Sequence, residues 1–151
     1  MRAMTGEPIS SGDARAAILS CHDELRGLVN ETIQFVDDPM QGLELMRAQA
    51  RDLCRALAAH IEFEERIVAI ALADVIGWGG VLLTQLEAEH AGQRARLAST
   101  LSAVETAELP KWELVESVHA LADTVLVDLA SEERYLLTAD IDALATDSQG
   151  G

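Results

Sequence analysis

The segment HIEFEER, residues 60–66, places His60 four residues before Glu64 in a stretch that is otherwise apolar on one face. Side chains at steps of three and four along this stretch share one side of a helix: Leu53, Leu57, His60, Glu64 and Ile67. A buried seam of this kind normally holds leucine or isoleucine. The imidazole and the carboxylate therefore need a partner that makes their burial favourable.

The distribution of proline and glycine divides the chain into four helical segments. Both residues are concentrated near 37–42, 77–80 and 108–110, and no segment alternates between polar and apolar residues as a strand would. The pattern predicts helices over about 11–36, 40–75, 81–107 and 110–145, with Pro110 as an acceptable opening residue. Short connections make neighbouring helices antiparallel, so we expect an all-α, up-down-up-down four-helix bundle over residues 11–145. Residues 1–10 and 146–151 are expected to be flexible ends.

Composition narrows the class of protein and of partner. The 151 residues suit one globular domain, and 26 acidic against 11 basic residues give a formal charge of −15. This charge argues against nucleic acids and anionic membranes as partners and favours cations. The sequence shows no apolar leader and no span of about 18 apolar residues, and we interpret Cys21 and Cys54 as reduced thiols. We therefore expect a soluble, cytoplasmic protein, either a monomer or a homodimer.

Each predicted helix carries a metal-capable residue on its inward face. His22 lies in the first inward seam, His90 in the third, and Asp128 with Glu132 in the fourth. Unpartnered burial of such groups costs several kcal/mol each, against a typical total stability of about 5–15 kcal/mol. Bound cations would compensate them, because residues one helical turn apart can offer a nitrogen and an oxygen to a single site.

An internal repeat supports a shared site. A shift of 68 positions relates residues of the first half to residues of the second: His22 to His90, Arg26 to Arg94, His60 to Asp128, Glu64 to Glu132, Glu65 to Glu133 and Arg66 to Arg134. The sequence therefore predicts a duplicated helical hairpin. An approximate twofold axis between the two copies would bring the inward polar residues to one level of the bundle.

The charges of the inward residues suit two metal ions. Glu64, Asp128 and Glu132 bring three negative charges, so two divalent ions leave about one positive charge for a bridging hydroxide. Imidazole and carboxylate ligands without an inward thiolate favour iron or manganese over a structural zinc site.

In order, His22, the segment 60–66, His90 and the segment DLASEER (128–134) resemble the hemerythrin-like (HHE cation-binding) family. Its pattern is a lone His, His-x-x-x-Glu, a second lone His and a second His-x-x-x-Glu on four successive helices. The resemblance spans roughly residues 14–137 and implies an oxo- or hydroxo-bridged, non-heme di-iron centre, with manganese and zinc as alternatives. It implies two bridging carboxylates, Glu64 and Glu132, and three further ligands: His22, His60 and His90.

Asp128 departs from the family pattern, which has histidine at that place. An anionic ligand favours ferric iron, and this argues for reaction with dioxygen or peroxide rather than reversible oxygen carriage. Aspartate is also shorter than histidine, so Asp128 reaches the metal directly, through water, or not at all, and a site with one metal stays open. We expect an oxidase, an oxygenase or a peroxide-removing protein that takes electrons from an unidentified donor. The alternative is non-catalytic binding or sensing of oxygen, nitric oxide or iron.

Simpler interpretations stay open for several residues. His22 and His90 are either metal ligands or core histidines bonded to neighbouring groups, and vestigial ligands in a purely structural bundle are a third hypothesis. His119 lies nine residues before Asp128, which places it on the opposite side of the helical wheel, and it is expected to face solvent. Glu65 and Glu133, with Arg66 and Arg134, are expected to form salt bridges on the outer faces, and a role in supporting the ligands is the alternative.

Overall fold

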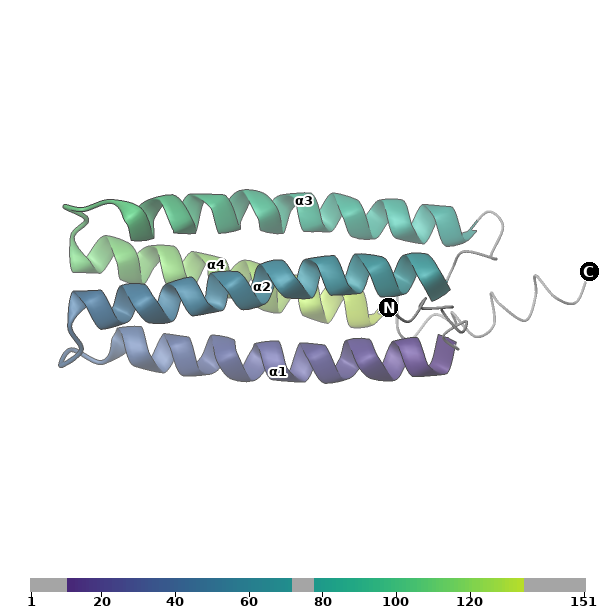
Figure 1. Ribbon diagram of the computed structural model, residues 1–151, viewed down its shortest axis with the longest axis horizontal. Coiled ribbons are helices and arrows are strands. Elements are labelled where there is room, and N and C mark those ends of the chain that lie inside the picture. Colours follow the sequence, from purple (N-terminus) through teal and green to yellow (C-terminus); the bar gives the residue numbers. More distant parts are fainter. Residues whose placement is uncertain (1–10, 72–77, 135–151) are drawn as a thin grey trace, which may run out of the picture.

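The computed structural model describes residues 11–71 and 78–134, with the side chains of 13–70 and 83–134. These residues form four helices and no strand: α1 (Ser11–Asp37), α2 (Leu43–Ala71), α3 (Trp78–Glu105) and α4 (Lys111–Glu132). Figure 1 shows them as long, nearly parallel rods in one bundle. The predicted all-α four-helix bundle is confirmed.

The helices follow one another around the bundle. Each helix packs against its neighbours in sequence, and α4 also packs against α1, which closes the ring. The connections 38–42 and 106–110 lie together at one end of the bundle, whereas α2 ends and α3 begins at the other (Figure 1). Neighbouring helices are therefore antiparallel, as short connections require.

Three helix starts differ from the sequence prediction, and one of them is α2, which begins at Leu43 instead of residue 40. Pro110 is the N-cap of α4 rather than its first residue, because its ψ of 144° is extended, and its carbonyl accepts hydrogen bonds from the Glu113 and Leu114 amides. The third helix begins at Trp78 instead of residue 81. Its two glycines, Gly79 and Gly80, thus fall in the first turn, where the amide groups have no partner within the helix anyway.

The core has an apolar part and a polar layer. Near the end that carries the connections 38–42 and 106–110, the core consists of the buried side chains of Val36, Met46, Ala50, Val104, Leu109, Leu114 and Val118. The middle of the bundle is filled by another apolar cluster: Leu25, Val29, Leu53, Cys54, Leu57, Ile61, Leu97, Leu121, Ala122, Val125 and Leu129. Toward the opposite end, where α2 ends and α3 begins, further apolar side chains are buried: Ile18, Ile67, Val68 and Leu86. Buried histidines and glutamates lie between these apolar regions.

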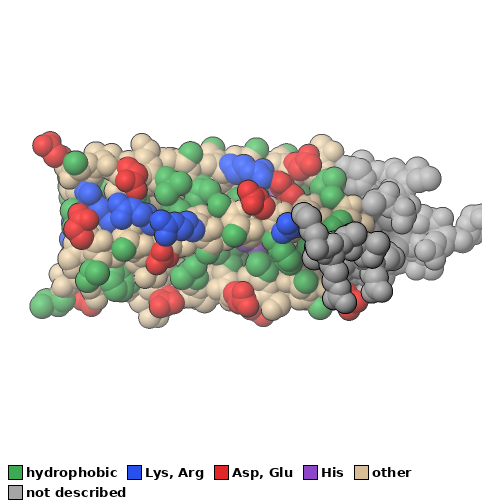
Figure 2. Space-filling view, in the orientation of Figure 1, with side chains coloured by type: hydrophobic (Ala, Val, Ile, Leu, Met, Phe, Trp, Pro, Cys, Tyr) green, Lys and Arg blue, Asp and Glu red, His purple; other side chains and the backbone are tan. Residues whose placement is uncertain are grey.

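The outer surface shows little of this polar layer. Acidic, basic and apolar side chains are interspersed on the face drawn in Figure 2, and almost no histidine is visible on it. Among the described residues, no helix combines the length and the apolar character that crossing a membrane requires.

Candidate metal centre

Five side chains from all four helices meet in the polar layer. They are His22 of α1, His60 and Glu64 of α2, His90 of α3 and Glu132 of α4, and none exposes more than 3% of its surface. Each belongs to the inward face that the three-and-four spacing defines in its helix. The structure thus brings together five of the six residues that the sequence nominated as metal ligands.

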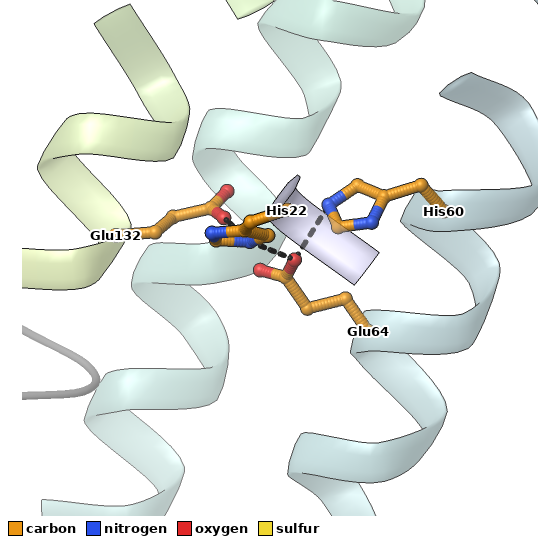
Figure 3. Close-up of side chains that lie close together, drawn as sticks. All are labelled: His22, His60, Glu64 and Glu132. Carbon is orange, nitrogen blue, oxygen red and sulfur yellow. Dashed lines mark hydrogen bonds and ion pairs between the residues drawn. The ribbon is translucent and has the colours of Figure 1, made fainter. Parts of the chain in front are cut away.

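One side of the cluster is a compact set of four residues. Oε2 of Glu64 lies 2.9 Å from Nε2 of His22 and 2.7 Å from Nε2 of His60. Oε2 of Glu132 lies 3.2 Å from the same His22 nitrogen. One donor atom from each of these four side chains lies within 4.8 Å of all the others, and Figure 3 shows them converging. Two imidazole nitrogens and two carboxylates form a donor set that iron, manganese or zinc accepts.

His90 approaches the same carboxylates from the other side. Its Nε2 atom lies 3.2 Å from Oε1 of Glu132 and 3.7 Å from Oε1 of Glu64. Each of the two glutamates therefore directs Oε2 toward His22 and Oε1 toward His90. Carboxylates placed between two groups of imidazoles have the arrangement that bridging ligands adopt between two cations.

Several of these atoms lie close together without forming hydrogen bonds. Nε2 of His60, Nε2 of His90, Oε1 of Glu64 and both carboxylate oxygens of Glu132 are buried and make no hydrogen bond of good geometry, although they approach one another closely. Buried polar atoms without partners are rare in native proteins and cost about 1–3 kcal/mol each. These nitrogens and oxygens lie in one buried cluster, so a bound cation would accept their lone pairs and remove the cost of leaving them unbonded. The residues present therefore fit a metal site.

Charges inside the cluster shift the pKa values of its members. Burial raises the pKa of Glu64, but the surrounding histidines outweigh burial and hold it below its usual range. Burial and the charge of Glu64 raise the pKa of Glu132. Burial lowers the pKa of His22 and His90, yet their contacts with Glu132 and Glu64 prevail and raise these values to about 9 and about 10. Protons on the two histidines thus balance the carboxylates when no metal is bound.

Comparison with known protein families bears directly on this donor set. The hemerythrin HHE cation-binding domain matches residues 13–139. The chain belongs to this family. No curated protein and no solved structure matches it. The resemblance inferred from the sequence is confirmed, and the cation-binding character of the HHE domain agrees with the buried donor set.

In this HHE domain, His22 and His90 each contact a glutamate through Nδ1, and an arginine donates to that glutamate. Nδ1 of His22 lies 3.2 Å from Oε1 of Glu133, and Arg26 donates to Oε2 of that glutamate at 2.7 Å. A glutamate fixed by arginine holds the imidazole with Nε2 toward the cluster, as the outer partners of metal-binding histidines do.

The second half of the HHE domain repeats this arrangement. Nδ1 of His90 lies 3.0 Å from Oε1 of Glu65, and Arg94 donates to both oxygens of Glu65 at 3.0 and 2.8 Å. From the sequence, Glu65 and Glu133 were expected on outer faces, with a supporting role as the alternative. The structure shows that Glu133 contacts His22 and Glu65 contacts His90. Arg26 and Arg94 were missed as partners, although the shift of 68 positions relates them.

His60 has a different outer partner. Its Nδ1 atom lies 3.0 Å from Sγ of Cys21. Burial and the charges of Glu24 and Glu64 raise the pKa of the Cys21 thiol, so it is neutral near pH 7. His60 therefore contacts a neutral sulfur where His22 and His90 contact carboxylates.

Asp128 is the sixth nominated residue, and it lies apart from the compact set of four. It is half-buried on α4 and lines a groove on the α3 side of the bundle. Burial raises the pKa of Asp128 and Glu89 raises it further, while Gln93 and His90 lower it. The repeat makes Asp128 the equivalent of His60, but the aspartate side chain is shorter and reaches less far toward the cluster. Contact between Asp128 and a metal ion stays a prediction.

Proposed function

We propose that this HHE domain holds two iron ions in the buried cluster and reacts with dioxygen or peroxide, as an oxidase, an oxygenase or a peroxide-removing enzyme. The observation that carries the proposal is the two-sided arrangement of Glu64 and Glu132. Each directs one oxygen toward His22 and the other toward His90. This arrangement favours two cations over one.

The ligands divide between the two positions. His22 and His60 would hold one ion and His90 the other, with Glu64 and Glu132 between them. Asp128 would complete the second position through a water molecule. Bound iron supplies the one-electron redox chemistry that imidazole and carboxylate side chains lack.

The protein's own residues exclude water and orient the imidazoles. His22, Glu64, His90 and Glu132 each have 0% relative exposure, so a ligand must be small to reach them. This burial favours dioxygen, peroxide or nitric oxide over an organic substrate. It equally supports a second candidate function, the non-catalytic binding or sensing of such small molecules. The free thiols of Cys21 and Cys54 are in keeping with a cytoplasmic location, which we also propose.

The experiment has two steps. Metal analysis of the purified protein, with anomalous scattering at the iron edge, should give about two iron ions per chain. Absence of iron, manganese and zinc at near-stoichiometric level would reject the metal proposal and favour a structural bundle.

In the second step, the protein is reduced without oxygen, oxygen or peroxide is admitted, and the visible spectrum is followed. An irreversible spectral change with consumption of oxidant, repeated over several cycles of reduction, supports an enzyme. A change that reverses when oxygen is removed supports the binding or sensing function instead.

A further inference from the structure

Two surface grooves occupy equivalent positions in the two halves of the repeat. One involves α1 and α2, and the other α3 and α4. Adding 68 to residues that line the first groove gives residues that line the second: Cys21, Glu24, Leu28, Ala56 and His60 correspond to Glu89, Gly92, Arg96, Thr124 and Asp128. The grooves are thus counterparts beside the same buried cluster.

The two grooves differ in size and in chemistry. The α1–α2 groove measures about 170 Å³ and the α3–α4 groove about 490 Å³. Gly92 stands where the first groove has Glu24, and a Cβ atom added at Gly92 would meet nothing within 4 Å. Two carboxylates, Glu89 and Asp128, replace the thiol and the imidazole. The α3–α4 groove is therefore wider and acidic.

Polar atoms without a hydrogen bond of good geometry lie at and beside the groove: Glu89 lines it, and Gln93 is buried beside its lining residue Asp128. Gln93 is 1% exposed, and its amide approaches the Asp128 carboxylate, but neither amide atom makes a hydrogen bond of good geometry. Ser131 donates to Oε1 of Glu89 at 3.4 Å, which leaves Oε2 of Glu89 buried and without a partner. The equivalent of Gln93 in the first half is the apolar Leu25. A buried amide at this place needs an explanation that packing does not supply.

The acidic end of the groove adjoins the polar layer of the core. Glu89 and Gln93 lie on either side of His90 in the sequence of α3, and Asp128 lies one turn before Glu132 in α4. Among the described residues that line the groove, Arg96 is the one basic residue, and it follows Glu89 by seven residues, or about 10 Å along the helix. Negative charge therefore accumulates at the end of the groove that is nearer the cluster.

We propose that the acidic end of the α3–α4 groove, formed by Glu89 and Asp128 with the buried amide of Gln93 beside Asp128, binds a hydrated divalent cation and passes it to the buried cluster. The proposal rests on the metal-binding function proposed above. Carboxylate and amide oxygens with retained water are ligands that suit a divalent cation before it loses its hydration shell. A groove lined by carboxylates also raises the local concentration of cations and so the rate at which they enter.

The test measures the rate and the extent of metal loading separately. The metal-free, full-length protein is mixed with Co²⁺ in a stopped-flow instrument, and visible absorption reports Co²⁺ reaching imidazole and carboxylate ligands. Glu89→Gln removes one carboxylate from the groove, and Gly92→Phe fills the groove from a position that faces open space. We expect each substitution to slow loading about tenfold, with the number of Co²⁺ ions bound at equilibrium unchanged.

Two matched variants control for charge and for glycine replacement. Glu87→Gln removes the same charge from an exposed position of α3, and Gly27→Phe makes the same replacement at an exposed position of α1 with open space around it. Both should load at the wild-type rate. Added salt should slow the wild-type protein more than Glu89→Gln, since screening weakens the attraction that this variant has already lost.

The outcomes separate this proposal from the function on which it rests. If Glu89→Gln and Gly92→Phe load as fast as the wild-type protein, the entry route is wrong and the metal centre stands. Fewer Co²⁺ ions bound by Glu89→Gln would also overturn the route, because Glu89 would then belong to the resting site. A wild-type protein that binds no Co²⁺ overturns the metal centre itself. Should Gly92→Phe not fold, Glu89→Gln decides alone.

Discussion

At the scale of single residues, Glu64 connects more of the cluster than any other described side chain. Its Oε2 atom faces His22 of α1 and His60 of its own helix, while Oε1 faces His90 of α3. The histidines hold the pKa of Glu64 below its usual range, so it is an anion at any pH near neutrality. The negative charge of Glu64 would therefore attract a cation bound on either side of the polar layer.

Replacement of Glu64 should abolish metal binding. We expect Glu64→Ala to lower metal affinity more than about 100-fold, since even the outer partners of metal ligands contribute roughly 10–100-fold. His119→Ala is the control, because His119 forms an exposed pair with Asp37 at 2.7 Å, away from the cluster. Isothermal titration with Co²⁺ measures both. Equal effects of the two substitutions would contradict the assignment.

Glu133 and Glu65, which contact His22 and His90 at Nδ1, should also affect metal affinity. Glu133→Gln and Glu65→Gln remove the charge that His22 and His90 face at Nδ1, and each should weaken metal binding about 10–100-fold. Glu62→Gln changes the same charge at an exposed position of α2 and should leave the affinity unchanged. Affinities within about twofold of wild type for the first two variants would show that these contacts are only structural.

Asp128, which we interpret as standing in the place of a family histidine, should tune the reduction potential of bound iron. Asp128→His replaces an anionic group by a neutral one and should raise the reduction potential of the iron-loaded protein, because an anion stabilises ferric iron. Spectroelectrochemical titration measures the change. An unchanged potential would mean that Asp128 lies too far from the metal to influence it.

At the scale of helices, periodicity alone identified most of what the structure shows. The three-and-four spacing placed His22, His60, Glu64, His90 and Glu132 on inward faces, because a helix of 3.6 residues per turn leaves little freedom for such a seam. Helix ends were less certain. The extended ψ of Pro110 and the helical glycines after Trp78 depend on local backbone conformations that residue type only biases.

Contacts between helices were harder to infer. The spacing put Asp128 in the same seam as Glu132, yet it is half-buried at the α3–α4 groove, because a side chain at the seam's edge follows the local gap between helices. The contact between Cys21 and His60 depends on how α1 packs against α2, which no single-helix pattern specifies. Only the repeat carried a signal across helices, through the equivalent pairs Glu65 with Arg94 and Glu133 with Arg26.

Two helix glycines offer a test of stability at this scale. Gly27 and Gly92 lie inside α1 and α3, and an added Cβ atom meets nothing within 4 Å at either position. Gly27→Ala and Gly92→Ala should each raise the free energy of unfolding by about 0.5–1 kcal/mol. Thermal unfolding followed by circular dichroism should show a rise in Tm of roughly 1–4 °C for each. Destabilisation by Gly92→Ala alone would indicate a backbone contact at the groove.

For the whole molecule, the polar layer makes stability depend on metal and on protons together. Without metal, Glu64 and Glu132 face each other across the core, and protonated His22 and His90 compensate them. A raised histidine pKa contributes stability that is complete below the unfolded value of 6.5 and is lost as the pH rises through the folded values. Those values are about 9 and about 10. The metal-free bundle should therefore weaken as the solution becomes alkaline.

Metal removal should reveal this dependence. At a metal concentration 1,000 times the dissociation constant, binding stabilises the fold by about 4 kcal/mol, or roughly 8–16 °C in Tm for a domain of this size. The Tm of the chelated protein should fall between about pH 6.5 and 10, whereas the loaded protein should change less, because metal replaces the protons on His22 and His90. Calorimetry of both forms across this pH range measures the difference between their Tm values, which should increase with pH. A difference that decreases would mean that protons do not occupy these histidines in the metal-free protein.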